Sequence, residues 1–228
     1  MGRFFNYDNP ILKTIGKIGD VVYLSVFWLL CSLPVFTIGA STTALYYALN
    51  KVVRHNRGYS WSEFFQSFKA NFKQSTIIWF IVIGIYLIGI ADCYFARIFF
   101  NTVPLAIVFI IFVTMWVVYI FPYVARFGNT TQAILKNCAL IAIANFPRTI
   151  LLFLLLVVSL LVFFIVPCGM MFVPGIYMFL ANRILEPVFR KYMTPEDLKA
   201  EEMRNSEYIQ DTFGDETKEE QSTESKQE

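Results

Sequence analysis

The stretch VVYLSVFWLLCSLPVFTIGASTTALYYALN, residues 21–50, contains no Asp, Glu, Lys, Arg or His. A helix needs about 20 apolar residues to cross a ~30 Å hydrocarbon core, so this stretch is longer than one upright crossing requires. Pro34 and Gly39 interrupt it, because proline removes an amide donor and glycine loosens the backbone. We therefore predict a membrane span over about residues 15–33, a turn, and a shorter returning helix over about residues 42–53.

Three further uncharged runs extend this pattern to the rest of the chain, at residues 74–91, 98–125 and 149–182. Backbone amides in hydrocarbon must be satisfied inside the segment, and the alternating pattern of a membrane barrel is missing from these runs, so each span is predicted to be a helix. Proline and glycine divide the last run into two spans. The fold class is all-α, a polytopic helical membrane protein with five or six membrane helices. The later spans are predicted at about residues 75–96, 103–124, 149–166 and 170–189.

Composition supports a membrane class and divides the chain in two. Hydrophobic residues make up 57% of the 228 residues, against a usual ~45–50%, and charged residues only 16%. Residues 1–193 hold 15 Lys and Arg against 5 Asp and Glu, whereas residues 194–228 hold 4 against 12. We predict a helical transmembrane domain over residues 1–193 and an acidic, mostly disordered cytoplasmic tail over residues 194–228. This composition excludes a disulfide scaffold and a nucleic-acid binder with a strongly basic surface.

Orientation follows from the Lys and Arg residues of short loops, which stay on the cytoplasmic side. The loop 51–73 carries five and the loop 126–148 carries three, whereas the loop 92–102 carries only Arg97. Both basic loops and the C-terminus are therefore predicted to be cytoplasmic. The N-terminus is cytoplasmic, with six helices, if residues 21–50 form a hairpin, and it lies outside, with five, if they form one kinked span. We favour the hairpin because it places all basic segments on one face; a cleaved signal peptide is the competing interpretation of the N-terminus.

A first surface helix is predicted over about residues 61–72, inside the first basic loop. Ser60 followed by Glu63 is a capping box, which predicts that the helix begins there. Aromatic residues recur at helical spacing with polar residues between them. Such a helix lies at the membrane surface or under the bundle, where it packs against the spans or docks a partner protein. Its aromatic face consists of Trp61, Phe64, Phe65, Phe68 and Phe72.

A second surface helix is predicted over about residues 132–144, in the second basic loop. The triplet Ala-Asn-Phe occurs at the end of both surface helices, at residues 70–72 and 144–146. Each triplet leads into a pair of spans. Residues 58–125 and 128–189 therefore have the layout of a parallel internal repeat.

Candidate functional residues are few. The single histidine, His55, is flanked by Arg54 and Arg57 in a predicted loop, and the four cysteines form no close pair of the metal or redox kind. Phosphate-binding glycine loops, nucleophile elbows and HExxH sequences do not occur. We therefore predict no catalytic residues, cofactor or metal site, and no enzymatic activity.

Charged and polar residues near the span ends are the remaining candidates. Asp92 lies near the predicted outer face, and Arg183 and Glu186 near the inner face. Interfacial anchoring and an i, i+3 ion pair between Arg183 and Glu186 are one interpretation. The other is a polar pathway through the bundle. Its residues would be Asp92, Asn182, Arg183 and Glu186.

Several segments together resemble the YesL-like family, bacterial polytopic membrane proteins of a domain-of-unknown-function class. They are Phe4-Phe5-Asn6, the run LPVFTIGASTTALY at residues 33–46, Ser62-Glu63-Phe64-Phe65, and the run FKANFK at residues 68–73. The resemblance covers about residues 1–192. Family members are commonly encoded beside genes for carbohydrate ABC import and polysaccharide degradation, so the resemblance implies an association with sugar uptake. It implies no catalytic residues.

We therefore expect a multi-pass protein of the bacterial cell membrane, with a cytoplasmic C-terminus, that serves as an accessory or scaffolding component of carbohydrate uptake. The expected partners are the lipid bilayer and components of a carbohydrate ABC importer, and not nucleic acid. The alternative is a small-solute transporter or channel in its own right. A permease subunit of an importer is disfavoured because the cytoplasmic loops lack the Glu-Ala-Ala pattern followed by glycine that docks an ATPase.

Overall fold

A computed structural model describes residues 10–54, 59–95, 97–98, 103–166, 169–196, 198–199 and 203. Every regular element among these residues is helical, which confirms the predicted all-α class. His55, the predicted outer loop from residue 99 to 102 and most of the predicted acidic tail lie outside the described residues.

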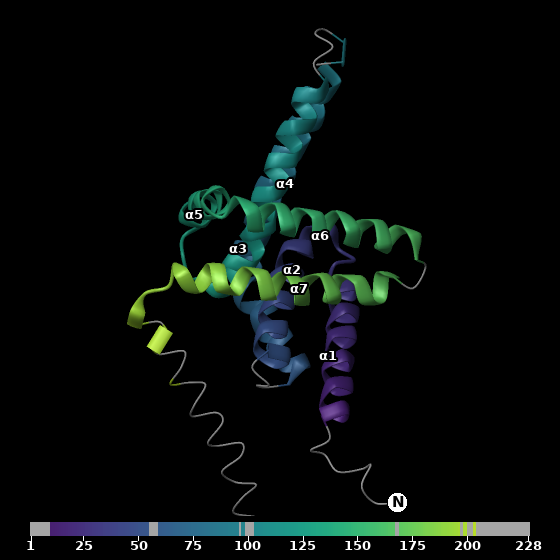
Figure 1. Cartoon of the computed structure of the whole chain (residues 1–228). Coiled ribbons are helices and arrows are strands. Elements are labelled where there is room, and N and C mark those ends of the chain that lie inside the picture. The colour runs from purple at the N-terminus through teal and green to yellow at the C-terminus, as the bar shows by residue number, and fades with distance from the viewer. Residues whose placement is uncertain are drawn as a thin grey trace, which may run out of the picture. The chain divides into compact units, whose positions relative to one another are not determined.

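The first uncharged run folds as a hairpin of two helices (Figure 1). Helix α1 covers Pro10–Cys31, a short 3-10 turn η1 covers Val35–Thr37, and α2 covers Ile38–Ala48. The chain then continues as the π-helix η2, Leu49–Arg54. The break falls at Pro34 as predicted, but α2 begins at Ile38 and not near residue 42. The residues around Gly39 belong to the returning helix because their small side chains pack inside the protein.

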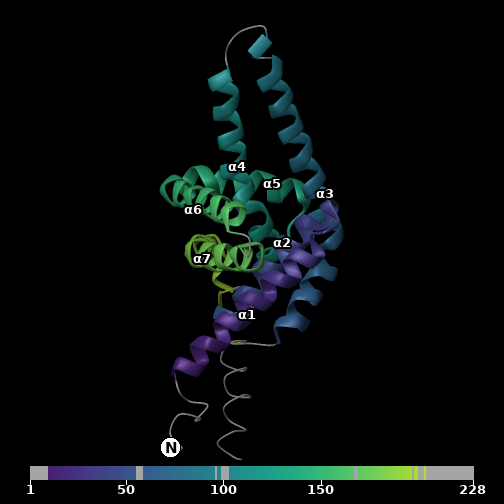
Figure 2. The same cartoon turned by 90° about the vertical axis from the view of Figure 1, so that its right-hand side faces the viewer.

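The remaining helices follow in the predicted order. They are α3 (Ser60–Phe95), α4 (Val103–Arg126), α5 (Thr131–Ala144), α6 (Phe146–Ile165) and α7 (Gly169–Lys191). Helices α3 and α4 contact one another, and Figure 2 shows them extending together as a pair. Helix α7 runs without interruption through Pro174 and Gly175, so the division of the last uncharged run lies between Ile165 and Gly169.

Three helices among the described residues, α3, α4 and α6, are long and apolar enough to cross a membrane. Their apolar side chains point outward: only 17%, 22% and 11% of the most apolar windows of these helices are buried. A water-soluble helix would bury such residues, so this arrangement indicates surfaces that face lipid. The predicted total of five or six spans, and the predicted orientation, stay predictions.

Helix α2 lies inside the helical assembly. It contacts α1, α3 and α4, and eight of its eleven residues are buried. Three consecutive hydroxyl residues, Ser41, Thr42 and Thr43, each donate a hydrogen bond to the backbone carbonyl four residues earlier, at 3.0, 2.7 and 3.0 Å. These bonds satisfy the hydroxyls within the helix, so polar residues can occupy an apolar interior.

Gly39 allows α2 and α3 to come close together. A β-carbon at position 39 would lie 2.7 Å from the carbonyl oxygen of Ser75 and 2.8 Å from the ring of Phe121. Beside this contact, Thr43 Oγ1 and Ser75 Oγ are 3.0 Å apart, and Trp79 Nε1 donates to the carbonyl of Val35 at 2.8 Å. The position therefore requires glycine because of the close approach of two backbones.

The predicted surface helix 61–72 and the predicted span 75–96 form one continuous helix. Helix α3 has 36 residues, about 54 Å at 1.5 Å per residue. In the second half of the chain, α5 ends at Ala144 and α6 begins at Phe146, with Asn145 outside helical geometry at φ −119° and ψ 42°. The difference follows from the residue after the Ala-Asn-Phe triplet, which is Lys73 in α3 and Pro147 in α6. Pro147 has no N–H to continue the hydrogen bonds of α5, and its ring clashes with the carbonyl of the residue four positions earlier, so only the second copy breaks. The predicted repeat is therefore not reproduced in the helix bounds.

The chain divides into two compact units, Met1–Glu186 and Pro187–Glu228. The boundary lies inside α7, a few residues before the composition change after residue 193. All of the contacts discussed below belong to the first unit.

We predict that Gly39→Ala lowers the free energy of unfolding by about 1–3 kcal/mol, because the new methyl group must push α2 away from α3. The measurement is thermal unfolding of the detergent-solubilised protein followed by tryptophan fluorescence. Gly84→Ala is the matched control, since no atom lies within 4 Å of a β-carbon at position 84. Alanine at that half-buried helical position, where the new methyl group has open space, should stabilise the protein by at most about 1 kcal/mol. Equal midpoints for the two variants would contradict the close approach.

Candidate functional site

A buried carboxylate joins three helices of the first unit. Glu186 of α7 is 1% exposed. Its Oε1 accepts a hydrogen bond from Arg126 Nη2 at 2.7 Å, and its Oε2 accepts from Asn50 Nδ2 at 2.8 Å and from the Tyr46 hydroxyl at 3.2 Å. We call Glu186, Arg126, Asn50 and Tyr46 the carboxylate cluster.

The helix ends bring these four residues together. Tyr46 and Asn50 are four residues apart at the junction of α2 and η2, so they lie on one face of that helix. Arg126 is the last residue of α4, where a cation also interacts favourably with the helix dipole. Because the donors come from two helices and the acceptor from a third, the cluster fixes how the ends of α2, α4 and α7 meet.

The electrostatics of the cluster are those of a structural ion pair. An unpaired buried charge is costly, whereas a carboxylate that accepts several hydrogen bonds is stabilised. Both oxygens of Glu186 already accept bonds from protein donors. In this arrangement the carboxylate is enclosed by its own partners, and its chemistry is to hold helices together.

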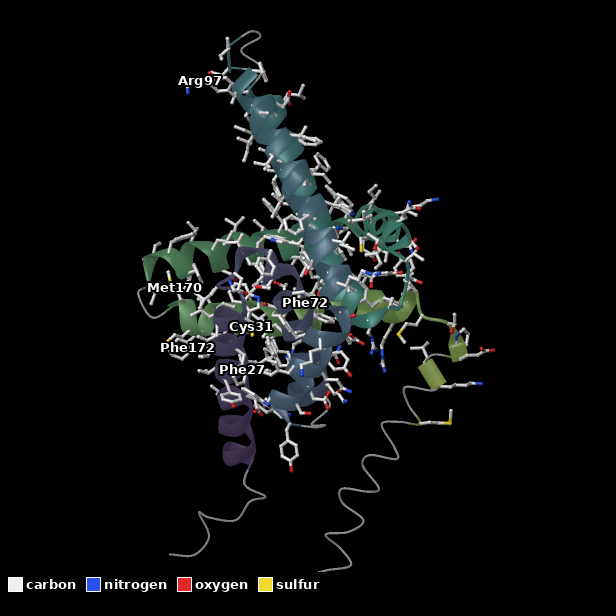
Figure 3. All side chains as sticks on the ribbon, turned by 180° about the vertical axis from the view of Figure 1, so that it is seen from behind. Phe27, Cys31, Phe72, Arg97, Met170 and Phe172 are labelled. Carbon is white, nitrogen blue, oxygen red and sulfur yellow. The ribbon has the colours of Figure 1, made fainter. Side chains whose placement is uncertain are left out.

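The predicted polar pathway is only partly assembled. Asn182 and Glu186 are both buried on one face of α7. Asp92 is exposed in the last turn of α3, near Arg97, which Figure 3 places at the tip of the α3–α4 pair. Arg183 is exposed, and its guanidinium lies 5.4 Å from the ring centre of Phe179. The four predicted residues therefore do not form one continuous polar path in the described part of the chain.

The predicted i, i+3 ion pair between Arg183 and Glu186 is wrong. Glu186 pairs with Arg126, sixty residues away in sequence, because its carboxylate faces the interior where three donors converge. The sequence did not indicate the three partners of Glu186, which are Tyr46, Asn50 and Arg126. Arg126 offered one signal, since it is the cation that ends the uncharged run 98–125, but nothing in the sequence indicated its partner.

A second polar group connects η2, α1 and the start of α3. Lys51 Nζ and Glu63 Oε2 form an ion pair at 2.8 Å, and Ser60 Oγ donates to Asp20 Oδ1 at 2.6 Å. The predicted capping box is therefore replaced by two interhelical bonds. Ser60 and Glu63 do mark the start of α3, but their side chains bind other helices and not the first turn of their own.

The aromatic face of residues 61–72 packs partly inside the protein. The ring of Phe27 in α1 lies 4.8 Å from Trp61, 5.9 Å from Phe64 and 5.8 Å from Phe65, measured between ring centres. Phe64 is fully buried and Trp61 is 54% exposed. Phe68 and Phe72 are half-buried and continue the row at 6.3 and 5.4 Å from their preceding neighbours, with Phe27 and Phe72 marked in Figure 3. The face therefore serves intramolecular packing, with its exposed edge at Trp61.

The cysteine of α5 is a poor nucleophile. Cys138 is buried in α5, and burial raises the pKa of its thiol above the ordinary value. A raised pKa keeps the thiol protonated at neutral pH and removes its nucleophilicity. Groups of three or more His, Cys, Asp and Glu side chains able to hold a metal ion do not occur among the described residues.

The fold and this site define an all-helical protein with helices of membrane-spanning length and an interior tied by polar contacts. Residues 21–93 match the model of a family described as protein of unknown function, DUF624. The matched segment is about a third of the chain and contains α2, η2 and nearly all of α3. No curated protein and no solved structure matches the chain.

We predict that Glu186→Leu lowers the free energy of unfolding by about 1–3 kcal/mol, because it leaves the Arg126 guanidinium, whose side chain is 19% exposed, without its carboxylate partner. The double variant Glu186→Leu/Arg126→Met should recover most of this loss, since it removes both charges. Thermal unfolding in detergent measures both effects. Glu196→Gln is the control, because Glu196 is exposed. A double variant as unstable as the single variant would contradict the assigned pairing.

Proposed function

We propose that this chain is a multi-pass protein of the bacterial cell membrane that acts as an accessory or scaffolding component of carbohydrate uptake and catalyses no reaction. The observation that carries this proposal is the contrast between its interior and its surface. Inside, both carboxylate oxygens of Glu186 accept hydrogen bonds from protein donors. Outside, large apolar side chains cover α3, α4 and α6. Such a protein is built to hold a shape in a membrane.

The exposed edge of the aromatic face supports a docking role. Tyr59 and Trp61 are 85% and 54% exposed at the start of α3. Phe64, one turn further, is locked against Phe27. Exposed aromatic side chains on a helix that is held by buried neighbours are typical of an interaction hot spot, because little conformational freedom is lost on binding. Lys and Arg in the adjoining segments favour a cytoplasmic position for this edge under the positive-inside rule.

The link to carbohydrate uptake rests on the resemblance of the chain to the YesL-like family. The partner suggested by that resemblance is a component of a carbohydrate ABC importer. The scaffold proposal is favoured over autonomous transport because Asp92, Arg183 and Glu186 do not form a continuous polar path.

We expect a photo-crosslinking amino acid at position 61 to capture an importer component in cells, identified by mass spectrometry. The same amino acid at position 80 is the matched control, because Phe80 is 57% exposed on the apolar part of the same helix and should capture lipid. Position 64 is unsuitable because Phe64 is fully buried. Recovery of lipid alone from both positions would contradict the docking role.

Reconstitution separates the scaffold from a transporter. Purified protein in liposomes should accumulate radiolabelled sugar no faster than protein-free liposomes do. Sugar or ion flux without any partner would overturn the scaffold proposal in favour of a transporter or channel.

A further inference from the structure

A cavity of about 940 Å³ lies between α1, the start of η2 and α7, entirely within the first unit. Most of its wall is apolar, with Ile18 and Val21 on α1 and Ile176 and Phe179 on α7. Two cationic residues, Lys17 and Arg183, complete the wall. The cavity therefore combines a long apolar surface with positive charge.

A close contact between α1 and α7 borders this cavity. The Gly175 amide of α7 donates to Ser25 Oγ of α1 at 2.8 Å, and a β-carbon at position 175 would lie 2.5 Å from the carbonyl oxygen of Val21. Helices α1 and α7 therefore touch at Gly175. Gly175 and Ser25 set the distance between the two helices at this contact, and the cavity lies beside it.

The two cations are available to a ligand. Lys17 and Arg183 form no ion pair within the described part of the chain. The two nearest acidic residues in sequence are engaged elsewhere, Asp20 by Ser60 and Glu186 by Arg126. The guanidinium carbon of Arg183 lies 5.4 Å from the ring centre of Phe179, so the ring helps to hold a guanidinium whose N–H groups can donate to a phosphate oxygen.

The apolar wall determines which anion fits. Ile18 is 60% exposed and Ile176 is 49% exposed. A small free anion would leave these side chains against water, whereas a molecule with an anionic head and a hydrocarbon chain covers the wall and pairs with both cations. Basic pockets between membrane helices bind lipid headgroups by the same combination.

We propose that this cavity binds an anionic phospholipid, with its phosphate between Lys17 and Arg183 and an acyl chain along Ile18 and Ile176. Binding follows from charge complementarity at one end and burial of apolar surface along the rest. The site is independent of the scaffolding role, and its test does not measure carbohydrate uptake.

The test compares phospholipids on the intact chain by native mass spectrometry in detergent, with phosphatidylglycerol and phosphatidylcholine as probes. The wild-type protein should retain phosphatidylglycerol preferentially. Each cation near a lipid surface is worth a factor of roughly five, so Lys17→Gln/Arg183→Gln should weaken phosphatidylglycerol binding about 30-fold. Lys69→Gln/Lys73→Gln is the matched control, because both lysines are exposed on α3 away from the cavity and the charge change is the same. The control should bind as the wild type does.

Two further arms keep the outcome decisive if the double variant is unstable. In the wild-type protein, phosphatidylglycerol with a diazirine on its acyl chain should label peptides of α1 and α7 around Ile18 and Ile176. Glycerol phosphate, which carries the anion without the chain, should not displace the lipid. Equal loss in both double variants, equal binding of phosphatidylcholine, displacement by glycerol phosphate, or labelling spread evenly over α4 and α6 would each overturn the proposal.

Discussion

The close approach of α2 to α3 at Gly39 is the constraint on which the rest of the structure depends. A helix that is enclosed by three others can approach them only where its side chains are small. Gly39, Ala40, Ser41 and Ala44 provide that surface, and all four are buried. The hydroxyls of Ser41 and Thr43 donate to carbonyls of their own helix, so both are satisfied at the close contact. The packing of α2 against α3 places Tyr46, and Asn50 in the following η2, beside Arg126 of α4 and Glu186 of α7.

The helical region contains few acidic residues, and most of those described bond another helix. Residues 1–193 contain five Asp and Glu. Of the four that the structure describes, three bond another element: Asp20 binds Ser60 of α3, Glu63 binds Lys51 of η2, and Glu186 binds Arg126 of α4. In a low-dielectric interior such bonds are strong when both partners are present and costly when one is missing. They therefore select one arrangement of helices that apolar packing alone would leave loosely specified, because Leu, Val and Phe surfaces are interchangeable.

Much of the fold followed from sequence because the membrane imposes simple length rules. Uncharged runs, the break at Pro34 and the positions of α4, α5 and α6 were all predictable from charge, proline and helical rise. The continuity of α3 was not predicted, since the amphipathic face around Phe64 and the span after Ser75 have different patterns. Pro147 interrupts the helix at the α5–α6 corner, whereas α3 has Lys73 at the matching position. The carboxylate cluster could not be predicted either, because its partners lie up to 140 residues apart and carry no local motif.

The distribution of polar contacts also separates two kinds of helix surface in the first unit. The ion pairs that join different helices, Lys51–Glu63 and Arg126–Glu186, lie next to the segments that are rich in Lys and Arg. Helices α3 and α4 carry outward apolar residues such as Ile88, Ile90 and Phe112, and the Tyr86 hydroxyl lies 2.9 Å from Thr114 Oγ1 where the two helices meet. Elsewhere the helices are joined by neutral hydrogen bonds, such as Thr43 to Ser75 and Gly175 to Ser25, so charged side chains are concentrated near the ion pairs. Lys17 and Arg183 form no ion pair among the described residues, because the acidic residues near them are already bound to other helices. The same economy of acidic residues that fixes the helices therefore leaves a net positive cavity for an anionic ligand.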